Sequence, residues 1–381
     1  MHIQVQDSIS NIEPTDWNGL LTRDDPFLRH EFLLALEKSG SVSRETGWSP
    51  CHLTCEDDSG NLLGALPLYL KDNSYGEFVF DFAWAGAYQQ AGLPYYPKLV
   101  SSVPFTPATG SRILVSGQQA DRDKIRSALV AGAIDCTTNS GASSLHILFP
   151  TAEETPLLEQ SEMLLRKDCQ FHWHNRGYAD FDHFLAGFTS AKRKKTRRER
   201  RRIEEQSIRF ELRTGRDLDE DAWQEIMPLY RTTFLRRGRE PYLGMEFFLQ
   251  LSATLPDSLV VFLGYAGDEL VAVAVCFRSD TTLYGRYWGA NQYIDSLHFE
   301  TCYYQGIEYC IAEGLQIFEP GTQGEHKISR GFVPTETWSA HWLTHPQFAA
   351  AVDDYLERER EHIDRYIDVV ASHVPYKNDT S

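Results

Sequence analysis

The first half of the chain alternates between helical stripes and runs of apolar residues that are typical of strands. Residues 24–40 carry apolar side chains at helical spacing, with an aspartate cap, a proline in the first turn and a glycine at the end. Residues 51–57 and 62–71 predict two strands joined by the turn DDSGN as a hairpin. The other elements predicted here are strands in 75–85, 111–115, 143–149 and 169–178 and helices in 121–138 and 153–168.

The second half repeats this order of helices and strands. A short amphipathic helix in 180–188 comes before a very basic helix in 191–206, which Ser190 can cap. The elements predicted after it are a strand in 207–214, a helix around 223–234, three strands within 258–290, a helix in 297–314, strands in 316–321 and 335–343 and a charged helix around 353–361. The pattern predicts an α/β protein with largely antiparallel sheets.

The two halves also share a local motif. In each, a turn glycine (Gly60 or Gly267) precedes an alanine-containing strand, a charged turn, a Tyr-Gly pair and an aromatic segment that ends in Gly-Ala. Hairpins produce such matches by chance, but the shared order of elements strengthens this one. We therefore expect two related domains, residues 1–178 and residues 179–381, the second containing the basic helix and the C-terminal helix.

Composition agrees with a folded protein of two domains. The chain has 381 residues, of which 42% are hydrophobic and 12% aromatic, which argues against disorder. The first 17 residues lack the features of a secretory signal, and no apolar run reaches the length of a membrane span. The simplest expected location is the cytoplasm. Seven dispersed cysteines without a CxxC pair predict buried thiols rather than a disulfide framework or a zinc site.

The basic segment stands out because the chain as a whole has a net charge of −17. Nine of the eleven residues from Lys192 to Arg202 are lysine or arginine. A general nucleic-acid binder would spread this charge over a face. Three interpretations stay open: a phosphate-binding helix, a solvated helix and a localisation signal, the last disfavoured by the position between ordered elements. The candidate phosphate ligands are Lys192, Lys194, Arg197 and Arg201.

A strand and the following helix supply candidate substrate-binding residues. Tyr284, Arg286 and Trp288 occupy alternate positions of the predicted strand, so we expect them on one face. Arg286 between two aromatic rings suits a carboxylate or a phosphate, although an outward arginine between core aromatics fits equally. His298 and Glu300, at the start of the next helix, either cap it or bind substrate.

The segment GTQGEHKISRG, residues 321–331, concentrates groups able to perform chemistry. Lys327 can hold an oxyanion or a phosphate, Glu325 or His326 can take a proton, and Arg330 can bind substrate. The alternative is a solvated polar loop. His172 and His174 point to one face of a strand, but no third ligand follows at a suitable spacing, so no metal site is predicted.

Several of these segments together resemble one family. The blocks YGRYWGANQYIDSLHFETCYYQGIEYCIAEGL, GEHKISRGF, YYPKLVSSVPFTPATG and AKRKKTRRERRRI resemble the FemAB-like predicted N-acyltransferases of the GNAT (acyl-CoA N-acyltransferase) superfamily over nearly the whole chain. The resemblance implies two tandem GNAT-like domains that transfer an acyl group to an amine by direct attack, without a covalent enzyme intermediate. In relatives a lysine before a Gly-Phe pair is functional; here Arg330 precedes Gly331-Phe332, and Lys327 lies farther back.

The donor and the acceptor stay open. The basic residue and glycine pair of the usual GNAT acetyl-CoA loop are not legible in GANQYIDSLHFE. The resemblance also offers aminoacyl-tRNA as donor and a peptidoglycan precursor as acceptor, beside acyl-CoA and a small-molecule amine. A non-catalytic RNA-binding or scaffold protein with the same fold is the alternative from another class.

The phosphate-binding interpretation of the basic helix can be tested by charge reversal. Replacing Lys194, Arg197 and Arg201 by glutamate is expected to weaken donor binding and to flatten its salt dependence, because fewer counterions are released. Titration of acyl-CoA or tRNA at several salt concentrations measures both quantities. Unchanged binding across the titration would leave a solvated helix.

Overall fold

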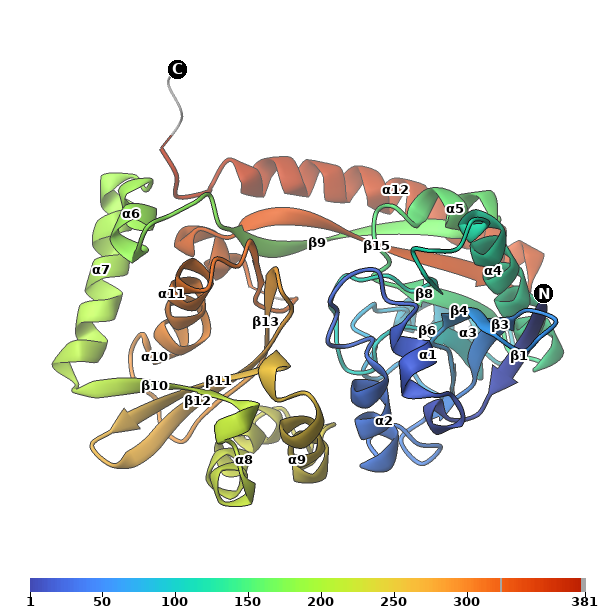
Figure 1. The fold of residues 1–381 in the computed structure, drawn as a ribbon. Helices are drawn as coiled ribbons and strands as arrows, with labels where there is room; N and C mark the ends of the chain where they lie inside the picture. Colours follow the sequence, from blue (N-terminus) through green and yellow to red (C-terminus); the bar gives the residue numbers. More distant parts are fainter. Residues whose placement is uncertain (323, 378–381) are drawn as a thin grey trace. The chain divides into compact units, whose positions relative to one another are not determined.

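The protein, described as a computed structural model over residues 1–322 and 324–377, forms two compact units (Figure 1). Unit 1 comprises Met1–Cys169 and Glu336–Arg365, and unit 2 comprises Gln170–Thr335 and the residues from Tyr366 onward. Both units combine helices with sheets in which antiparallel pairing dominates. The predicted α/β class with largely antiparallel sheets is confirmed.

The first sheet of unit 1 has four antiparallel strands in the order β1-β3-β4-β7. Their bounds are His2–Gln6, His52–Glu56, Leu62–Leu66 and Leu114–Val115. β3 and β4 form the predicted hairpin, with Leu53 opposite Leu66, but the strand predicted for 62–71 is divided into β4 and a second strand, Tyr69–Lys71, which joins another sheet. Gly60 in its turn has φ 84°, a backbone conformation that favours glycine.

The second sheet of unit 1 has the order β15-β8-β6-β5-β2. The bounds are Val333–Leu343, Ser144–Leu148, Lys98–Ser101, Tyr69–Lys71 and Trp48–Pro50. β6 and β8 pair in parallel, whereas the other neighbours pair antiparallel. The helix α4, Arg122–Asn139, follows β6 and β7 and returns the chain to β8.

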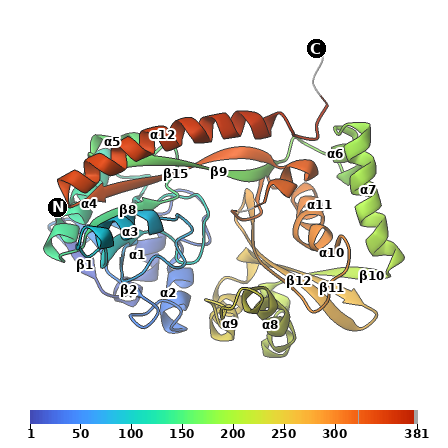
Figure 2. The same ribbon diagram turned by 180° about the vertical axis from the view of Figure 1, so that it is seen from behind.

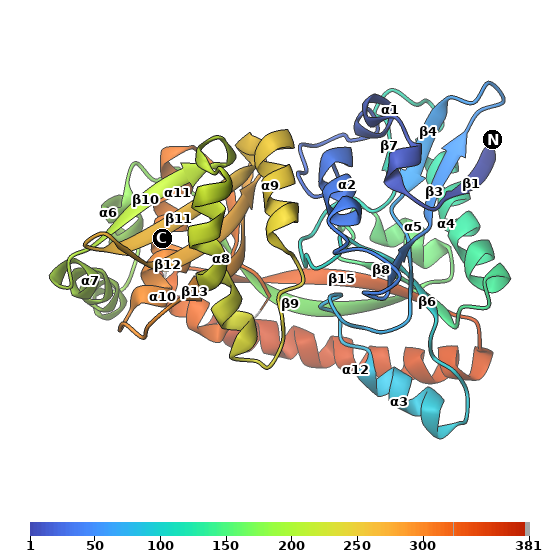
Figure 3. The same cartoon turned by 90° about the horizontal axis from the view of Figure 1, so that it is seen from below.

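The two faces of this second sheet differ in character. One face is apolar and packs against α4. Its members include Leu99, Leu145, Ile147 and Ala340, and they contact Ile125, Leu129, Val130 and Ala133 of the helix. The other face lies towards the helix α3, Phe82–Gln90, whose Trp84 ring contacts His146 and His341 (Figure 3).

The remaining helices of unit 1 are α1, Pro14–Asn18, α2, His30–Lys38, α5, Thr155–Gln160, and the part of α12, Pro346–Ala371, that lies before Tyr366. α2 begins later than predicted, because Asp25 caps a separate turn by accepting a hydrogen bond from the backbone N–H of Phe27 at 3.0 Å. The helix predicted for 153–168 ends at Gln160. Glu162, with φ 60°, reverses the chain into β9, Leu164–His174.

The strand predicted for 75–85 is wrong. Gly76 and Phe78 have φ values of 83° and 62°, which are incompatible with an extended strand, and the segment forms a loop that leads into α3. The local repeat of the sequence is therefore not a structural one, since Tyr284-Gly285 lies within a strand and Tyr75-Gly76 does not.

The single domain boundary predicted after residue 178 also differs from the structure. The chain passes from unit 1 to unit 2 after Cys169, within β9, and residues 336–365 belong to unit 1. The reason is strand pairing: His341 of β15 lies opposite His146 of β8. No sequence pattern indicates which sheet a late strand joins.

Unit 2 contains one sheet in the order β10-β11-β12-β13-β14-β9. The bounds of its further strands are Ile208–Thr214, Leu259–Ala266, Glu269–Arg278, Thr282–Ala290 and Ile317–Glu319. β13 and β14 run parallel, and the other pairs are antiparallel. Each unit thus contains a parallel pair that a helical segment connects.

The helices of unit 2 lie on both faces of its sheet (Figures 1 and 2). The helices α8, Glu220–Leu235, and α9, Met245–Thr254, cover one face, and α9 was not predicted. The other face carries α10, Leu297–Phe299, a π-helical turn, Glu300–Tyr304, and α11, Gln305–Ala312. The short helix α6, Phe181–Ala186, and the basic helix α7, Ser190–Glu205, lie between β9 and β10 in sequence.

The part of the chain that the structure describes has neither a membrane-spanning helix nor a disulfide bond. None of its helices is long and apolar enough to cross a membrane. Its seven cysteines are free thiols, of which Cys55, Cys276 and Cys310 are buried and the others partly buried.

The packing of α8 on β13 depends on a glycine without a side chain. A Cβ atom added to Gly289 would lie 1.8 Å from the carbonyl oxygen of Leu229 in α8. Gly289→Ala is therefore expected to lower the free energy of unfolding by about 3 kcal/mol, because backbone must move. Denaturant unfolding measures this. Gly86→Ala in α3, where nothing lies within 4 Å of the added Cβ, is the control, and an equal effect of both changes would contradict the prediction.

Candidate active site

The basic helix α7 is fixed in unit 2 by its one central carboxylate. Glu199 is buried and accepts hydrogen bonds from Arg330 Nη2 at 2.9 and 3.0 Å and from the Tyr304 hydroxyl. Thr196 and Ile203, which share the inner face of the helix with Glu199, are also buried. Glu199 thus joins three segments of the chain: the basic helix, the segment with Arg330 and the segment with Tyr304. The basic pattern of the sequence does not predict this role.

A second contact of α7 occupies Glu300. Arg200 donates to Glu300 Oε1 at 3.0 Å and to Glu308 Oε1 at 2.7 Å, and its guanidinium lies 4.5 Å from the centre of the Phe181 ring. Gln305 also donates to Glu300 at 2.8 Å. Burial raises the pKa of Glu300, and Arg200 opposes that rise. Glu300, which the sequence offers as a helix cap or a substrate-binding residue, forms a salt bridge with the basic helix in the structure.

The outer face of α7 presents a group of exposed cations, only some of which are paired with carboxylates. Lys194, Arg197, Arg198 and Arg201 are exposed, whereas Lys192 is half-buried on the side of the inner face. Arg197 pairs with Asp182 at 2.8 Å and Arg201 with Glu205 at 3.4 Å. Within the described residues, Lys194 and Arg198 have no carboxylate at ion-pair distance. Three of the four predicted phosphate ligands therefore face solvent.

A β-bulge changes the prediction for the strand β13. Gly285 pairs with Cys276 and Tyr287 with Val275, which leaves Arg286 as the extra residue. Tyr284 consequently shares a face with Tyr287, and Trp288 lies on the opposite face. The expectation that Tyr284, Arg286 and Trp288 line one face is wrong, because it assumed a regular alternation that the bulge interrupts.

The two faces of β13 serve different purposes. Tyr287 packs its ring against Tyr230 of α8 at 5.2 Å, and burial raises its pKa to about 12. Trp288 instead contacts the His298 ring at 4.9 Å on the side of the helical segment 297–312. Burial lowers the pKa of Arg286, and Tyr287 and Glu319 oppose that shift.

A chain of three polar rings forms the candidate centre. The Tyr303 hydroxyl lies 2.8 Å from His326 Nε2 and 3.5 Å from His298 Nε2. Cys302 Sγ lies 3.4 Å from His298 Nδ1. His298 is mostly buried, but His326 is exposed. The arrangement holds an accessible imidazole in a defined orientation.

Two irregular backbone segments produce this geometry. The π-helical turn that carries Cys302, Tyr303 and Tyr304 shifts their side chains relative to an α-helix. The 3₁₀ helix η5, Glu325–Arg330, begins after Gly324, which has φ 113°. A Cβ at Gly324 would lie 2.2 Å from Cε1 of His326, so a side chain there would displace the imidazole.

Burial keeps the imidazoles neutral. Burial lowers the pKa of His298 to about 4, and the partial burial of the His326 ring, although the residue is exposed overall, lowers the pKa of His326. Nearby positive charges add to both shifts. Burial raises the pKa of Tyr303 far above its ordinary value. At neutral pH both groups are therefore uncharged, and in the tautomer whose Nε2–H donates to the Tyr303 oxygen, His326 has Nδ1 free to accept a proton.

Lys327 is the buried amine of the site. Its side chain is 1% exposed and donates a hydrogen bond to the carbonyl of Gly321. Burial lowers its pKa to about 7, and the charge of Arg286 contributes to that shift. Such an amine exchanges its proton near neutral pH, as chemistry at an acyl centre requires.

The other two residues of this segment have different surroundings. Arg330 is buried, donates to Glu199 and to the His326 carbonyl at 2.7 Å, and lies 3.3 Å from the centre of the Phe299 ring. Glu325 is exposed and accepts a hydrogen bond from the Tyr366 hydroxyl at 2.9 Å. The structure thus brings His298 and His326 together and gives Arg330 and Glu325 separate partners.

Two further observations complete the site. Tyr303 and Cys302 were not identified from the sequence, although Tyr303 lies five positions after the candidate His298. His172 is buried at 3.2 Å from Gln170 Oε1, and burial lowers its pKa to about 3. Among the residues of known placement, no group of three or more His, Cys, Asp or Glu side chains could hold a metal ion.

Comparison with known proteins gives one family and several structures. The model of the FemAB-like family, described as peptidoglycan biosynthesis/recognition, matches residues 8–378. No curated protein matches the chain. Similar structures include FemX, with 11% identity, a TM-score of 0.54 and coverage of 93% of this chain and 100% of that one.

Two structures of another kind are also similar. The C-terminal domain of a putative lysylphosphatidylglycerol synthetase from Agrobacterium fabrum shows 9% identity and a TM-score of 0.56, with coverage of 91% of this chain and 96% of that one. L-PGS from Bacillus licheniformis shows 11% identity and a TM-score of 0.51, with coverage of 88% and 98%. At such identities the likeness establishes a shared fold.

The anchoring role of Glu199 gives a stability prediction. Glu199→Gln is expected to lower the free energy of unfolding by about 3 kcal/mol, because it leaves Arg330 buried without a charged partner. Denaturant unfolding of the purified variant measures the change. Glu204→Gln, at an exposed position of the same helix, is the control. Equal stability of the two variants would contradict the anchoring role.

Proposed function

The chain belongs to the FemAB-like family, as its sequence motifs indicate, and on that basis we propose that it is an N-acyltransferase that moves an acyl or aminoacyl group from an activated donor to an amine. The family description supports an amine acceptor related to peptidoglycan. The fold shared with FemX supports the tandem GNAT-like architecture that the sequence implies.

The observation that best supports this reaction is the 2.8 Å contact between the Tyr303 hydroxyl and His326 Nε2, next to the buried Lys327. The nitrogen of the acceptor attacks the carbonyl carbon of the donor, and a C–N bond forms. The proton released by that nitrogen passes to the neutral His326, which Tyr303 orients. His298 remains neutral, and its Nε2 lies 3.5 Å from the same Tyr303 hydroxyl.

Lys327 acts on the leaving side of the reaction. In its protonated form it stabilises the oxyanion of the tetrahedral intermediate and then gives a proton to the departing oxygen or sulfur. The C–O or C–S bond of the donor breaks in this step. Exchange with solvent returns the proton from His326 to Lys327, so the products are an amide and a free hydroxyl or thiol.

The outer face of α7 supports a donor that carries phosphates. Lys194, Arg197, Arg198 and Arg201 form an exposed cationic face on unit 2, which suits the phosphates of acyl-CoA or of aminoacyl-tRNA. Either donor is consistent with it, and the acceptor is a small amine or a peptidoglycan precursor. The same face also favours the rival function of RNA binding without catalysis.

Turnover separates the two functions. An enzyme releases thiol from acyl-CoA or deacylates aminoacyl-tRNA when an amine is present, and Lys327→Ala is expected to reduce this rate by at least about 100-fold. An RNA-binding protein would bind tRNA with equal affinity in wild type and variant and would turn over neither donor. Lys377→Ala is the matched control, because that lysine is exposed and its ammonium donates to the backbone carbonyl of Ala186.

The pH dependence of the wild-type rate tests the assigned roles. Turnover is expected to fall as the pH rises through about 7, because Lys327 loses its proton there, and to fall again at acidic pH as His326, whose pKa is lowered by partial burial, becomes protonated. A profile of kcat between pH 5 and 9 measures both limbs. A rate that climbs steadily to pH 9 would contradict the role of Lys327 as a proton donor.

A further inference from the structure

One face of the second sheet of unit 1 carries a row of buried ionisable side chains. Lys71 of β5 lies directly opposite Lys98 of β6, and His146 of β8 lies opposite His341 of β15. Val100, two residues after Lys98, lies opposite His146, so the four side chains share one face of the sheet. Each of the four is at most 1% exposed.

Such a row is costly to bury. The reverse face of the same strands is made of Leu99, Leu145, Ile147 and Ala340 and packs as an ordinary apolar core. Replacing buried charges by apolar residues of similar size is often neutral or stabilising, so stability does not explain the ionic face. A buried, perturbed cluster of this kind is a candidate site for a ligand.

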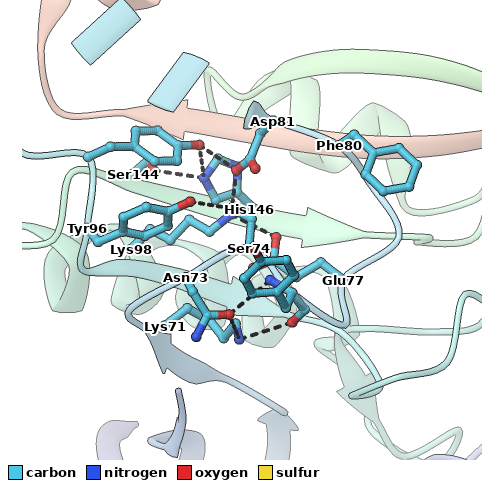
Figure 4. Close-up of polar contacts among 12 residues, drawn as sticks. Lys71, Asn73, Ser74, Glu77, Phe80, Asp81, Tyr96, Lys98, Ser144 and His146 are labelled. Atoms are coloured by element: carbon cyan, nitrogen blue, oxygen red, sulfur yellow. Dashed lines mark hydrogen bonds and ion pairs between the residues drawn. The ribbon is translucent and has the colours of Figure 1, made fainter. Parts of the chain in front are cut away.

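Lys98 is fully satisfied within this cluster, as Figure 4 shows. It donates to Glu77 Oε2 at 2.7 Å, to Ser74 Oγ at 2.9 Å and to Asp81 Oδ2. Asp81 also accepts a hydrogen bond from the Tyr95 hydroxyl at 2.6 Å. The three donors of the Lys98 ammonium are therefore used, and one oxygen of each carboxylate is occupied.

The second oxygen of each of these two carboxylates has no hydrogen-bond partner among the described residues. These atoms are Glu77 Oε1 and Asp81 Oδ1, and Glu77 and Asp81 are only 3% and 2% exposed. A buried acceptor that lacks a donor costs about 1–3 kcal/mol. Two such acceptors in one cluster point to a ligand with hydrogen-bond donors.

Lys71 does not supply those donors. Its nearest acceptors are Asn73 Oδ1 at 3.4 Å and the Tyr75 carbonyl at 3.3 Å, and its ammonium lies 3.8 Å from the centre of the Trp48 ring. Among the described residues, no carboxylate lies at ion-pair distance from the Lys71 ammonium. Burial lowers the pKa of Lys71 to about 7, which makes it a weak competitor for Glu77.

The loop over this face also presents aromatic rings to solvent. Tyr75, Phe80 and Phe82 are 51%, 59% and 48% exposed, and the Phe82 ring lies 6.1 Å from that of Tyr75 and 6.2 Å from that of Phe80. The same segment that turns Glu77 and Asp81 inward therefore turns three rings outward. A ligand with one cationic end and an apolar body matches the inward carboxylates and the outward rings.

We propose that residues 71–82 and β6 form a binding site for a small primary amine, whose ammonium donates to Glu77 Oε1 and Asp81 Oδ1 and whose apolar body contacts the exposed rings. Both oxygens lie beneath the loop, so the amine enters as the loop 72–81 shifts. Gly76 and Phe78 hold that loop in left-handed backbone conformations, without helix or strand. This proposal does not depend on the acyltransferase function.

The charge of the cluster supports a cation above neutral pH. Glu77 and Asp81 raise the pKa of Lys98 against the effect of burial, and Lys98 in turn lowers the pKa of Asp81 to about 2. Burial and nearby positive charge lower the pKa of His146 to about 3. Burial raises the pKa of Glu77 to about 7. Below pH 7 the cluster has a net positive charge, because Lys71 and Lys98 are protonated and only Asp81 is ionised. Above pH 7 its net charge is negative, because Glu77 is also ionised and Lys71 is neutral. The exposed Asp72 and the neutral Tyr95, Tyr96 and His341 leave the sign of this change unaltered.

Calorimetric titration of the full chain with phenethylamine tests the proposal. Phenethylamine is expected to bind at least about 10-fold more tightly than 2-phenylethanol, which lacks the charge, or its trimethylammonium analogue, which has no N–H donor. Binding is also expected to be tighter at pH 8.5 than at pH 5.5. Absence of binding, or equal binding of the trimethylated analogue, would overturn the site.

Variants localise the binding. Glu77→Gln is expected to weaken phenethylamine binding by about 10-fold, and Phe80→Ala by several-fold, because the first removes a charged acceptor and the second apolar contact. Glu159→Gln, at an exposed position of α5, is the matched control. Circular dichroism checks that each variant is folded. Because Phe80 is exposed, Phe80→Ala is expected to fold even if Glu77→Gln does not, and it keeps the test valid. Wild-type affinity for phenethylamine in the folded variants would refute the proposal.

Discussion

The buried carboxylate of Glu199 is the interaction on which the candidate active site depends. It binds Arg330 of η5 and Tyr304 of the π-helical turn, and it belongs to the basic helix α7. The segment with His326 and Lys327, the turn with Tyr303 and the cationic face of α7 thus converge on one charged centre. Without that negative charge, the buried Arg330 and the basic helix would have no common anchor.

Burial then determines what the site can do. It lowers the pKa of Lys327 to about 7 and holds His298 and His326 neutral, so ordinary side chains gain proton-transfer properties near neutral pH. The reactive groups need no unusual residue types. They need a low-dielectric setting and nearby positive charge, which the packing of α10, the π-helical turn and η5 around them supplies.

Ionisable groups are buried in both units, but in different ways. In unit 2 the Glu199–Arg330 pair satisfies both oxygens of its carboxylate. In unit 1 Lys98 satisfies only one oxygen each of Glu77 and Asp81. A buried carboxylate with both oxygens occupied serves to position segments, whereas one with an unpartnered oxygen retains capacity for a ligand that donates hydrogen bonds. This difference in hydrogen-bond satisfaction distinguishes an anchor from a candidate site.

The sequence by itself determined most of the local structure, because hairpins, helical stripes and the block GEHKISRGF depend on neighbouring residues. It also identified His298, His326 and Lys327 as candidates. It did not determine the bulge at Arg286, the loop at 75–81 or the return of β15 to unit 1, since these depend on pairing between distant strands. The tertiary structure alone turned Glu199, Glu300 and Arg330 into anchors and exposed the outer face of α7, because the environment of a charge is set by residues far away in the chain.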